Sequence, residues 1–157
     1  MPRIRHSIEI GKSPGEVFEI TNDIDNWKTL FNEYGHSEVI KREDAGRFTR
    51  LVFRLRNLEG NEWQSWRILD HNLLVAVAER DEPLFPFLYM HLKWTYDPVP
   101  NGTMMTWTQD FEIDPAFGVP ESEVVARMNA HGQENQKRIK GLIETGQAKM
   151  LRHDDGI

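Results

Sequence analysis

The hydrophobic pattern changes its period for the last time near Pro120, and this change constrains the fold more than any other feature. From residue 36 to 113, apolar residues alternate in short runs separated by turn signals, as they do in β-strands. From Pro120 to Gln147 they recur every three or four residues, as they do on one face of a helix. Strands followed by one long helix predict an α+β fold in which an antiparallel sheet wraps around that helix.

The apolar stripe of this long helix is interrupted in its middle. Its two ends carry Val124, Val125, Met128, Ile139, Leu142 and Ile143. Between them, the same face carries His131, Gly132 and Asn135. Because a buried amide costs stability unless it finds a hydrogen-bond partner, a core helix should not have this interruption. The pattern indicates a helix that lies over a partly polar cavity.

The rest of the chain supplies seven strand-like segments and two short helices. The strands are expected at residues 4–10, 36–42, 47–56, 61–69, 73–81, 86–97 and 103–113. Ser13, Pro14 and Glu16 form a capping box that begins a short helix, and a second short helix is expected near 24–31.

Asn101-Gly102 is a strong hairpin signal, so the last two strands should pair antiparallel. Their alternation points Trp94 and Trp107 inward. Five tryptophans and eight phenylalanines in 157 residues suit either a bulky core or a ligand cavity.

Composition and length exclude several classes of protein. We expect one domain at 1–147 and a disordered tail at 148–157. A net charge of −6 argues against a general nucleic-acid binder, and the absence of cysteine excludes disulfides and thiol chemistry. No signal peptide or bilayer-spanning run is visible, so we expect a cytoplasmic monomer without membrane contact. The six histidines lack ligand spacing, so no metal site is expected.

Five sequence words occur in an order that carries a family resemblance. They are TNDIDNWKTLFNEY (21–34), NEWQSWR (61–67), FLYMHLKWTYDPV (87–99), MTWTQDF (105–111) and NQKRIKGLIE (135–144). With the element order above, they resemble the aromatase/cyclases of bacterial type II polyketide pathways, nearest those of tetracenomycin-type and spore-pigment pathways. The resemblance implies the START/Bet v 1-like helix-grip fold: a curved antiparallel sheet of about seven strands around a long C-terminal helix, with two short helices after the first strand.

The resemblance also implies an activity. The substrate would be a poly-β-ketone tethered to an acyl carrier protein and made by a minimal polyketide synthase. The enzyme would direct first-ring closure by an intramolecular aldol reaction, followed by dehydration to an aromatic ring. The resemblance implies no metal or organic cofactor.

Matching the family words position by position assigns the candidate site residues. The substrate-binding candidates are Trp27, Phe31, Trp63, Met90, Trp94, Trp107, Gln109 and Asn135. The catalytic candidates are Arg67 as a donor to carbonyl oxygens, Ser65 on the same strand face, and Tyr34 as a proton donor. Trp66 departs from the family pattern, and alternation points it to the opposite face.

Each assignment has a plainer alternative. Arg67 could pair with a carboxylate at a strand end, the tryptophans could fill an ordinary core, and Gln109 and Asn135 could bond only to backbone groups. The whole protein could instead be a non-catalytic carrier of a hydrophobic ligand, or an interaction module with a filled interior.

Docking of an acidic carrier protein would need a local basic patch. Two faces qualify by spacing, although a solvated charged face is the default interpretation of both. They are Arg50, Arg54 and Arg56 on one strand, and Arg127, Lys137, Arg138 and Lys140 on the long helix.

Overall fold

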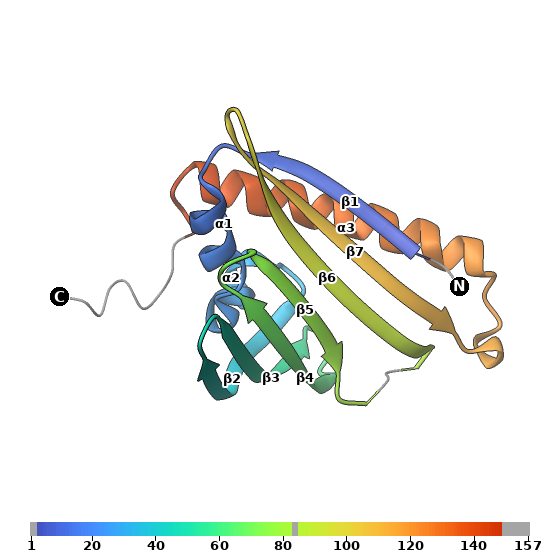
Figure 1. Cartoon of the computed structure of the whole chain (residues 1–157). Coiled ribbons are helices and arrows are strands. Elements are labelled where there is room, and N and C mark those ends of the chain that lie inside the picture. Colours follow the sequence, from blue (N-terminus) through green and yellow to red (C-terminus); the bar gives the residue numbers. More distant parts are fainter. Residues whose placement is uncertain (1–2, 83–84, 149–157) are drawn as a thin grey trace.

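In the computed structural model, which describes residues 3–82 and 85–148, a seven-stranded antiparallel sheet curves beside one long helix (Figure 1). The strands are β1 (Arg3–Ile10), β2 (Tyr34–Ala45), β3 (Phe48–Asn57), β4 (Glu62–Asp70), β5 (Val75–Arg80), β6 (Phe87–Val99) and β7 (Gly102–Ile113). The helical elements are α1 (Pro14–Thr21), the 3₁₀ turn η1 (Ile24–Asn26), α2 (Trp27–Leu30), the 3₁₀ turn η2 (Pro115–Phe117) and α3 (Glu121–Glu144). The predicted α+β helix-grip fold is confirmed.

The strand order β1-β7-β6-β5-β4-β3-β2 makes the first two strands the two edges of the sheet. The chain therefore has to cross from one edge to the other after β1, and α1, η1 and α2 make this crossing. As the Asn101-Gly102 signal predicts, β6 and β7 form a long hairpin, in which Trp94 lies directly opposite Trp107.

Local signals account for some of the element boundaries. Ser13 caps α1 by accepting a hydrogen bond from the backbone N–H of Glu16, at 3.4 Å. The predicted helix at 24–31 is instead a 3₁₀ turn followed by a single α-helical turn. The strand predicted to begin at residue 73 begins at Val75, because Leu74 takes a left-handed conformation (φ 55°) in the preceding turn.

Helix α3 packs along the inner face of the sheet beside β1 (Figure 1). Val124 near one end and Ile139 and Ile143 near the other are buried, as the interrupted stripe predicts. None of the helices in the described ranges is long and apolar enough to cross a lipid bilayer. The predicted tail lies outside the described residues from position 149 onward, and Ala148 is buried.

Gly132 allows α3 to approach β1 closely. A Cβ atom at position 132 would lie 2.7 Å from Cδ2 and Nε2 of the buried His6 ring. We expect Gly132→Ala to lower the free energy of unfolding by about 1–3 kcal/mol, as overpacking does, although alanine is the better helix former by roughly 1 kcal/mol.

Gly141 in the same helix provides the matched control, since a Cβ atom added there would meet no neighbouring atom within 4 Å. Gly141→Ala should raise the free energy of unfolding by about 0.4–1 kcal/mol. Urea denaturation measures both variants. A Gly132→Ala protein as stable as Gly141→Ala would contradict the close approach of α3 to His6.

Candidate functional site

A cavity of about 270 Å³ lies between the inner face of the sheet and α3. Its volume is just below the range of roughly 300–1,000 Å³ typical of small-molecule sites. Every residue that the sequence predicted for the site lines this cavity: Trp27, Phe31, Tyr34, Trp63, Ser65, Arg67, Met90, Trp94, Trp107, Gln109 and Asn135. The structure thus brings all of them together, and the role of each stays a prediction.

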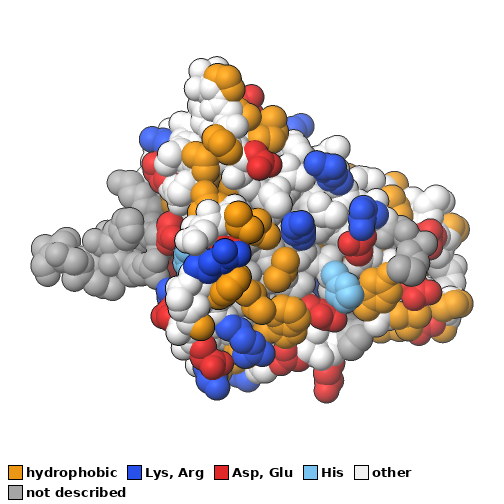
Figure 2. Space-filling model, viewed as in Figure 1, with side chains coloured by type: hydrophobic (Ala, Val, Ile, Leu, Met, Phe, Trp, Pro, Cys, Tyr) orange, Lys and Arg blue, Asp and Glu red, His pale blue; other side chains and the backbone are white. Residues whose placement is uncertain are grey.

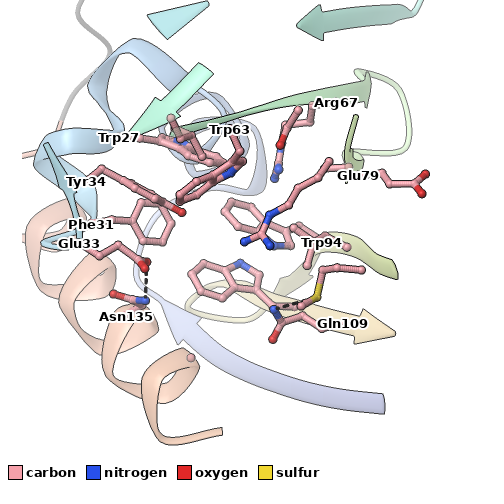
Figure 3. Close-up of a pocket in the computed structure, with 18 of the residues that line it drawn as sticks. Trp27, Phe31, Glu33, Tyr34, Trp63, Arg67, Glu79, Trp94, Gln109 and Asn135 are labelled. Carbon is pink, nitrogen blue, oxygen red and sulfur yellow. Dashed lines mark hydrogen bonds between the residues drawn. The ribbon is translucent and has the colours of Figure 1, made fainter. Parts of the chain in front are cut away.

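Aromatic rings form a continuous wall of this cavity (Figure 3). Trp94 and Trp107 stack with ring centroids 4.4 Å apart and planes 13° apart. Trp27 stacks on Trp94 at 5.8 Å and lies nearly parallel to Tyr34 at 6.1 Å. These rings pack in the hydrophobic core and also line the cavity. They therefore fill the core and can also contact a ligand.

Arg67 projects from β4 into the cavity and is 1% exposed. Its Nε donates a hydrogen bond to Asn22 Oδ1 at 2.8 Å. Its Cζ lies 4.2 Å from the ring centroid of Trp94 and 5.2 Å from that of Trp27. Within the described residues Nη1 and Nη2 have no hydrogen-bond partner and no carboxylate pairs with Arg67, so the alternative of a strand-end ion pair is wrong.

Burial shifts the pKa values of Arg67 and Tyr34, which both line the cavity. It lowers the pKa of Arg67 to about 10, so the guanidinium is still charged at neutral pH. Burial, with a smaller effect of Glu33, raises the pKa of the Tyr34 hydroxyl far above its ordinary value. Tyr34 therefore keeps its proton and can act as a hydrogen-bond donor.

A polar cluster joins α3 to the segment before β2 at the edge of the cavity. His131 Nε2 lies 3.1 Å from Glu33 Oε2, and Asn135 Nδ2 donates to Glu33 Oε1 at 3.4 Å (Figure 3). The Asn135 amide thus has a carboxylate partner rather than a backbone one. Sequence reasoning did not select Glu33, although it directly precedes Tyr34 in the word TNDIDNWKTLFNEY.

Arg80 is a second residue of the cavity lining that the sequence did not predict. Alternation along β5 places Ala76, Ala78 and Arg80 on the inner face, and Arg80 Cζ lies 4.9 Å from the ring centroid of Trp63. Burial lowers the pKa of Arg80. The signal was available in the alternation, but the segment 73–81 matches the family words poorly.

The remaining predicted residues add few polar contacts. Gln109 Nε2 lies 3.8 Å from Met90 Sδ, and Ser65 is buried on the same strand face as Arg67. Trp66 lies half-buried on the opposite face, as alternation predicts. In the described part of the chain, no three His, Asp or Glu side chains gather as they would to hold a metal ion.

This chain is similar to known proteins over most of its length. Residues 1–144 match the family model described as "Polyketide cyclase / dehydrase and lipid transport". A proposed polyketide cyclase of Streptomyces cyaneus is 35% identical over 133 residues, which cover 82% of this chain and 84% of that protein.

Two solved aromatase/cyclases have a similar backbone. The di-domain ARO/CYC BexL from the BE-7585A biosynthetic pathway aligns with a TM-score of 0.75 at 18% identity, over 92% of this chain and 47% of that one. The Zhui aromatase/cyclase from Streptomyces sp. R1128 aligns with a TM-score of 0.69 at 18% identity, over 89% and 92%. At these identities the likeness establishes the fold alone.

The pair of Glu33 and His131 should make stability depend on pH. The hydrogen bond to Glu33, with a smaller contribution from Glu134, raises the pKa of His131 above 6.5. A histidine whose pKa rises on folding contributes stability that is fully present below its unfolded pKa of about 6.5 and is lost as pH rises through the folded value. The effect should stay within about 1 kcal/mol because the pair is partly exposed.

We therefore expect wild type to exceed His131→Gln in free energy of unfolding by more at about pH 5.5 than at about pH 8.5. Urea denaturation at the two pH values measures this difference. Glu33→Gln should remove the same pH-dependent part. If both variants kept the wild-type pH profile, the pair would have no role in the pH dependence of stability.

Proposed function

Because the chain belongs to the polyketide cyclase, dehydrase and lipid transport family, we propose that it is an aromatase/cyclase acting on a carrier-bound poly-β-ketone. Family membership confirms the resemblance seen in the sequence words and supports a polyketide substrate. One observation carries the proposal: a tryptophan-walled cavity holds a buried guanidinium whose Nη1 and Nη2 have no partner among the described residues. Such a site suits a flat, conjugating chain with several carbonyl oxygens.

The chemistry requires selection of one chain conformation. A methylene carbon between two carbonyls loses a proton, and the resulting enolate attacks a distant carbonyl carbon to form the new C–C bond. The attacked oxygen becomes an alkoxide and takes up one proton, equal to the one lost from the methylene, to form a hydroxyl group. This hydroxyl leaves as water together with a hydrogen from the neighbouring ring carbon, and enolisation of the remaining ring ketones makes the ring aromatic. Since a free poly-β-ketone can cyclise in several ways, holding one enolate beside one carbonyl supplies both rate and regiospecificity.

The cavity residues suit particular parts of this sequence. Arg67 would donate from Nη1 and Nη2 to the enolate or alkoxide oxygen, in a site where water does not compete. Tyr34, which stays protonated, would donate a proton or hydrogen bond to the developing alkoxide. Ser65 would share an ordered water with Arg67, and the stacked rings of Trp27, Trp94 and Trp107 would hold the chain flat.

An acyl carrier protein would present the substrate, and its docking face is also a proposal. Four of the seven basic residues on the two candidate faces already have acidic partners: Arg50 pairs with Glu43, Arg54 with Glu62, Arg127 with Glu123 and Lys140 with Glu144. On the face shown in Figure 2, Lys and Arg side chains are interspersed with Asp and Glu. This distribution supports docking through dispersed charges, which would weaken with rising salt.

A carrier of hydrophobic ligands is the second candidate. The family description includes lipid transport, and the same cavity could retain an apolar ligand with Arg67 as its anchor. The two candidates differ in one respect: only a cyclase changes the distribution of products.

The decisive test reconstitutes a minimal type II polyketide synthase with and without this protein and analyses the products. We expect the protein to shift products from spontaneously cyclised compounds to one aromatic ring pattern. Arg67→Ala should fold, by circular dichroism, and reduce the directed product by about 10²–10³-fold, as loss of an oxyanion donor does.

Arg42→Ala is the matched control, because Arg42 is exposed and pairs with Asp44 away from the cavity. It should leave the product distribution as in wild type. An unchanged distribution with the wild-type protein, across several chain lengths, would remove the cyclase and leave the carrier. Full activity of Arg67→Ala would remove only the role assigned to Arg67.

A further inference from the structure

Asn22 was not predicted as a site residue from the sequence, and its side chain binds the Nε edge of the Arg67 guanidinium. Asn22 is 7% exposed and accepts the hydrogen bond from Arg67 Nε through Oδ1, at 2.8 Å. Its Nδ2 donates to the backbone oxygen of Phe18 at 2.9 Å and to the Tyr96 hydroxyl at 3.1 Å. Two acceptors on the Nδ2 side fix the orientation of the amide, so Oδ1 has to face Arg67.

This hydrogen-bond network is itself anchored. The Tyr96 hydroxyl lies 2.6 Å from Thr21 Oγ1, and the Thr21 hydroxyl donates to the backbone oxygen of Val17 at 2.8 Å. Helix α1 and β6 thus hold one edge of the guanidinium, while its other two nitrogens are buried beside the cavity without a hydrogen-bond partner in the described chain. The guanidinium is positioned before any ligand arrives.

The partner of Arg67 is neutral, and this has an electrostatic consequence. Asparagine and aspartate have nearly the same shape, but only aspartate would cancel the positive charge. The other ionisable groups acting on Arg67 are Tyr96 and Tyr34, and burial raises the pKa of both, that of Tyr96 to about 12. Neither supplies a negative charge at neutral pH, so the charge of Arg67 is left for a ligand.

The chemistry of that ligand follows from the geometry of the two unpartnered nitrogens. Two parallel N–H donors on a planar, charged group match two oxygens that share one negative charge. A 1,3-dicarbonyl compound acquires this arrangement when its central methylene loses a proton and the charge spreads over both oxygens. A carboxylate has the same pair of oxygens but needs no deprotonation at neutral pH.

We propose that Asn22 is a positioning residue that leaves the charge of Arg67 uncompensated, so that the cavity binds a 1,3-dicarbonyl segment as its enolate. The choice of a 1,3-dicarbonyl ligand rests on the function proposed above. On binding, the methylene proton goes to the buffer and the enolate oxygens accept from Nη1 and Nη2. The reactive anion is therefore stabilised in the ground state of the complex as well as in the transition state.

Calorimetric titration tests this with 1-phenyl-1,3-butanedione, a diketone too short to cyclise. Titrations near pH 7 in buffers of different ionisation enthalpy count the protons released per ligand bound. Wild type should release close to one proton. The monoketone 4-phenyl-2-butanone should bind without release, and phenylacetate should bind without release if the site takes any planar anion.

Three variants separate charge from position. Asn22→Asp cancels the charge, so proton release should vanish and diketone affinity should fall by about tenfold or more. Asn22→Ala leaves the charge but frees the guanidinium, so proton release should persist with weaker binding. Arg67→Gln removes the charge and should abolish release. Monoketone affinity should stay near wild type in all three.

Several results would overturn the inference. Wild type that binds the diketone without proton release, or fails to bind it, would remove the enolate site. Equal losses of diketone and monoketone binding in both Asn22 variants would reduce Asn22 to a structural role. If Asn22→Asp does not fold, because its new oxygen faces the Phe18 carbonyl, Asn22→Ala and Arg67→Gln still decide between these outcomes.

The inference and the proposed function can fail separately. The short diketone cannot form a ring, so its binding does not depend on cyclase activity. Proton release combined with an unchanged product distribution would remove the cyclisation and keep the enolate site. Directed cyclisation by a protein that releases no proton would do the reverse.

Discussion

Burial of a guanidinium without a carboxylate is the constraint on which the site depends. Moving such a charge out of water costs several kcal/mol even after relaxation. Here the compensation comes from the neutral Asn22 amide and from the faces of Trp27 and Trp94. These partners are anchored in turn: Asn22 on Phe18 and Tyr96, and Trp27 through its Nε1 on the Thr21 backbone oxygen at 2.9 Å. The crossing segment between β1 and β2 therefore positions the charge as much as β4 does.

The space in front of that charge exists because the elements around it carry small or polar residues at matching points. The inner face of β5 carries the small side chains of Ala76 and Ala78. Helix α3 presents Gly132 and Asn135 where a core helix would present larger apolar side chains. Protein interiors otherwise pack to nearly crystalline density, so an opening of this size requires such gaps on both sides. Glu33 then ties the polar part of α3 to the segment before β2.

Features that depend on local period could be predicted from the sequence, and those that depend on tertiary pairing could not. Alternation alone points Trp94 and Trp107 inward, and the interrupted stripe of α3 predicts a cavity beneath His131 and Asn135. By contrast, Asn22 and Arg67 are 45 residues apart, and Glu33 and Asn135 are 102 apart. No periodicity connects such positions, and asparagine is a residue type that is equally common in turns. The family words carried Arg67 into the prediction but not the amide behind it.

The arrangement also separates the energetic requirements of folding from those of binding. A long arginine side chain that became ordered only on ligand binding would lose up to about 2 kcal/mol of rotamer entropy at that moment. In this chain that entropy is lost during folding, when Asn22 and the two tryptophan faces fix the guanidinium. Fixed donors need no reorganisation when charge develops on the ligand, which is the condition under which electrostatic stabilisation is largest. The unpaired nitrogens of Arg67 are therefore unfavourable for the stability of the free protein and favourable for an anionic ligand, and the neutrality of Asn22 maintains that difference.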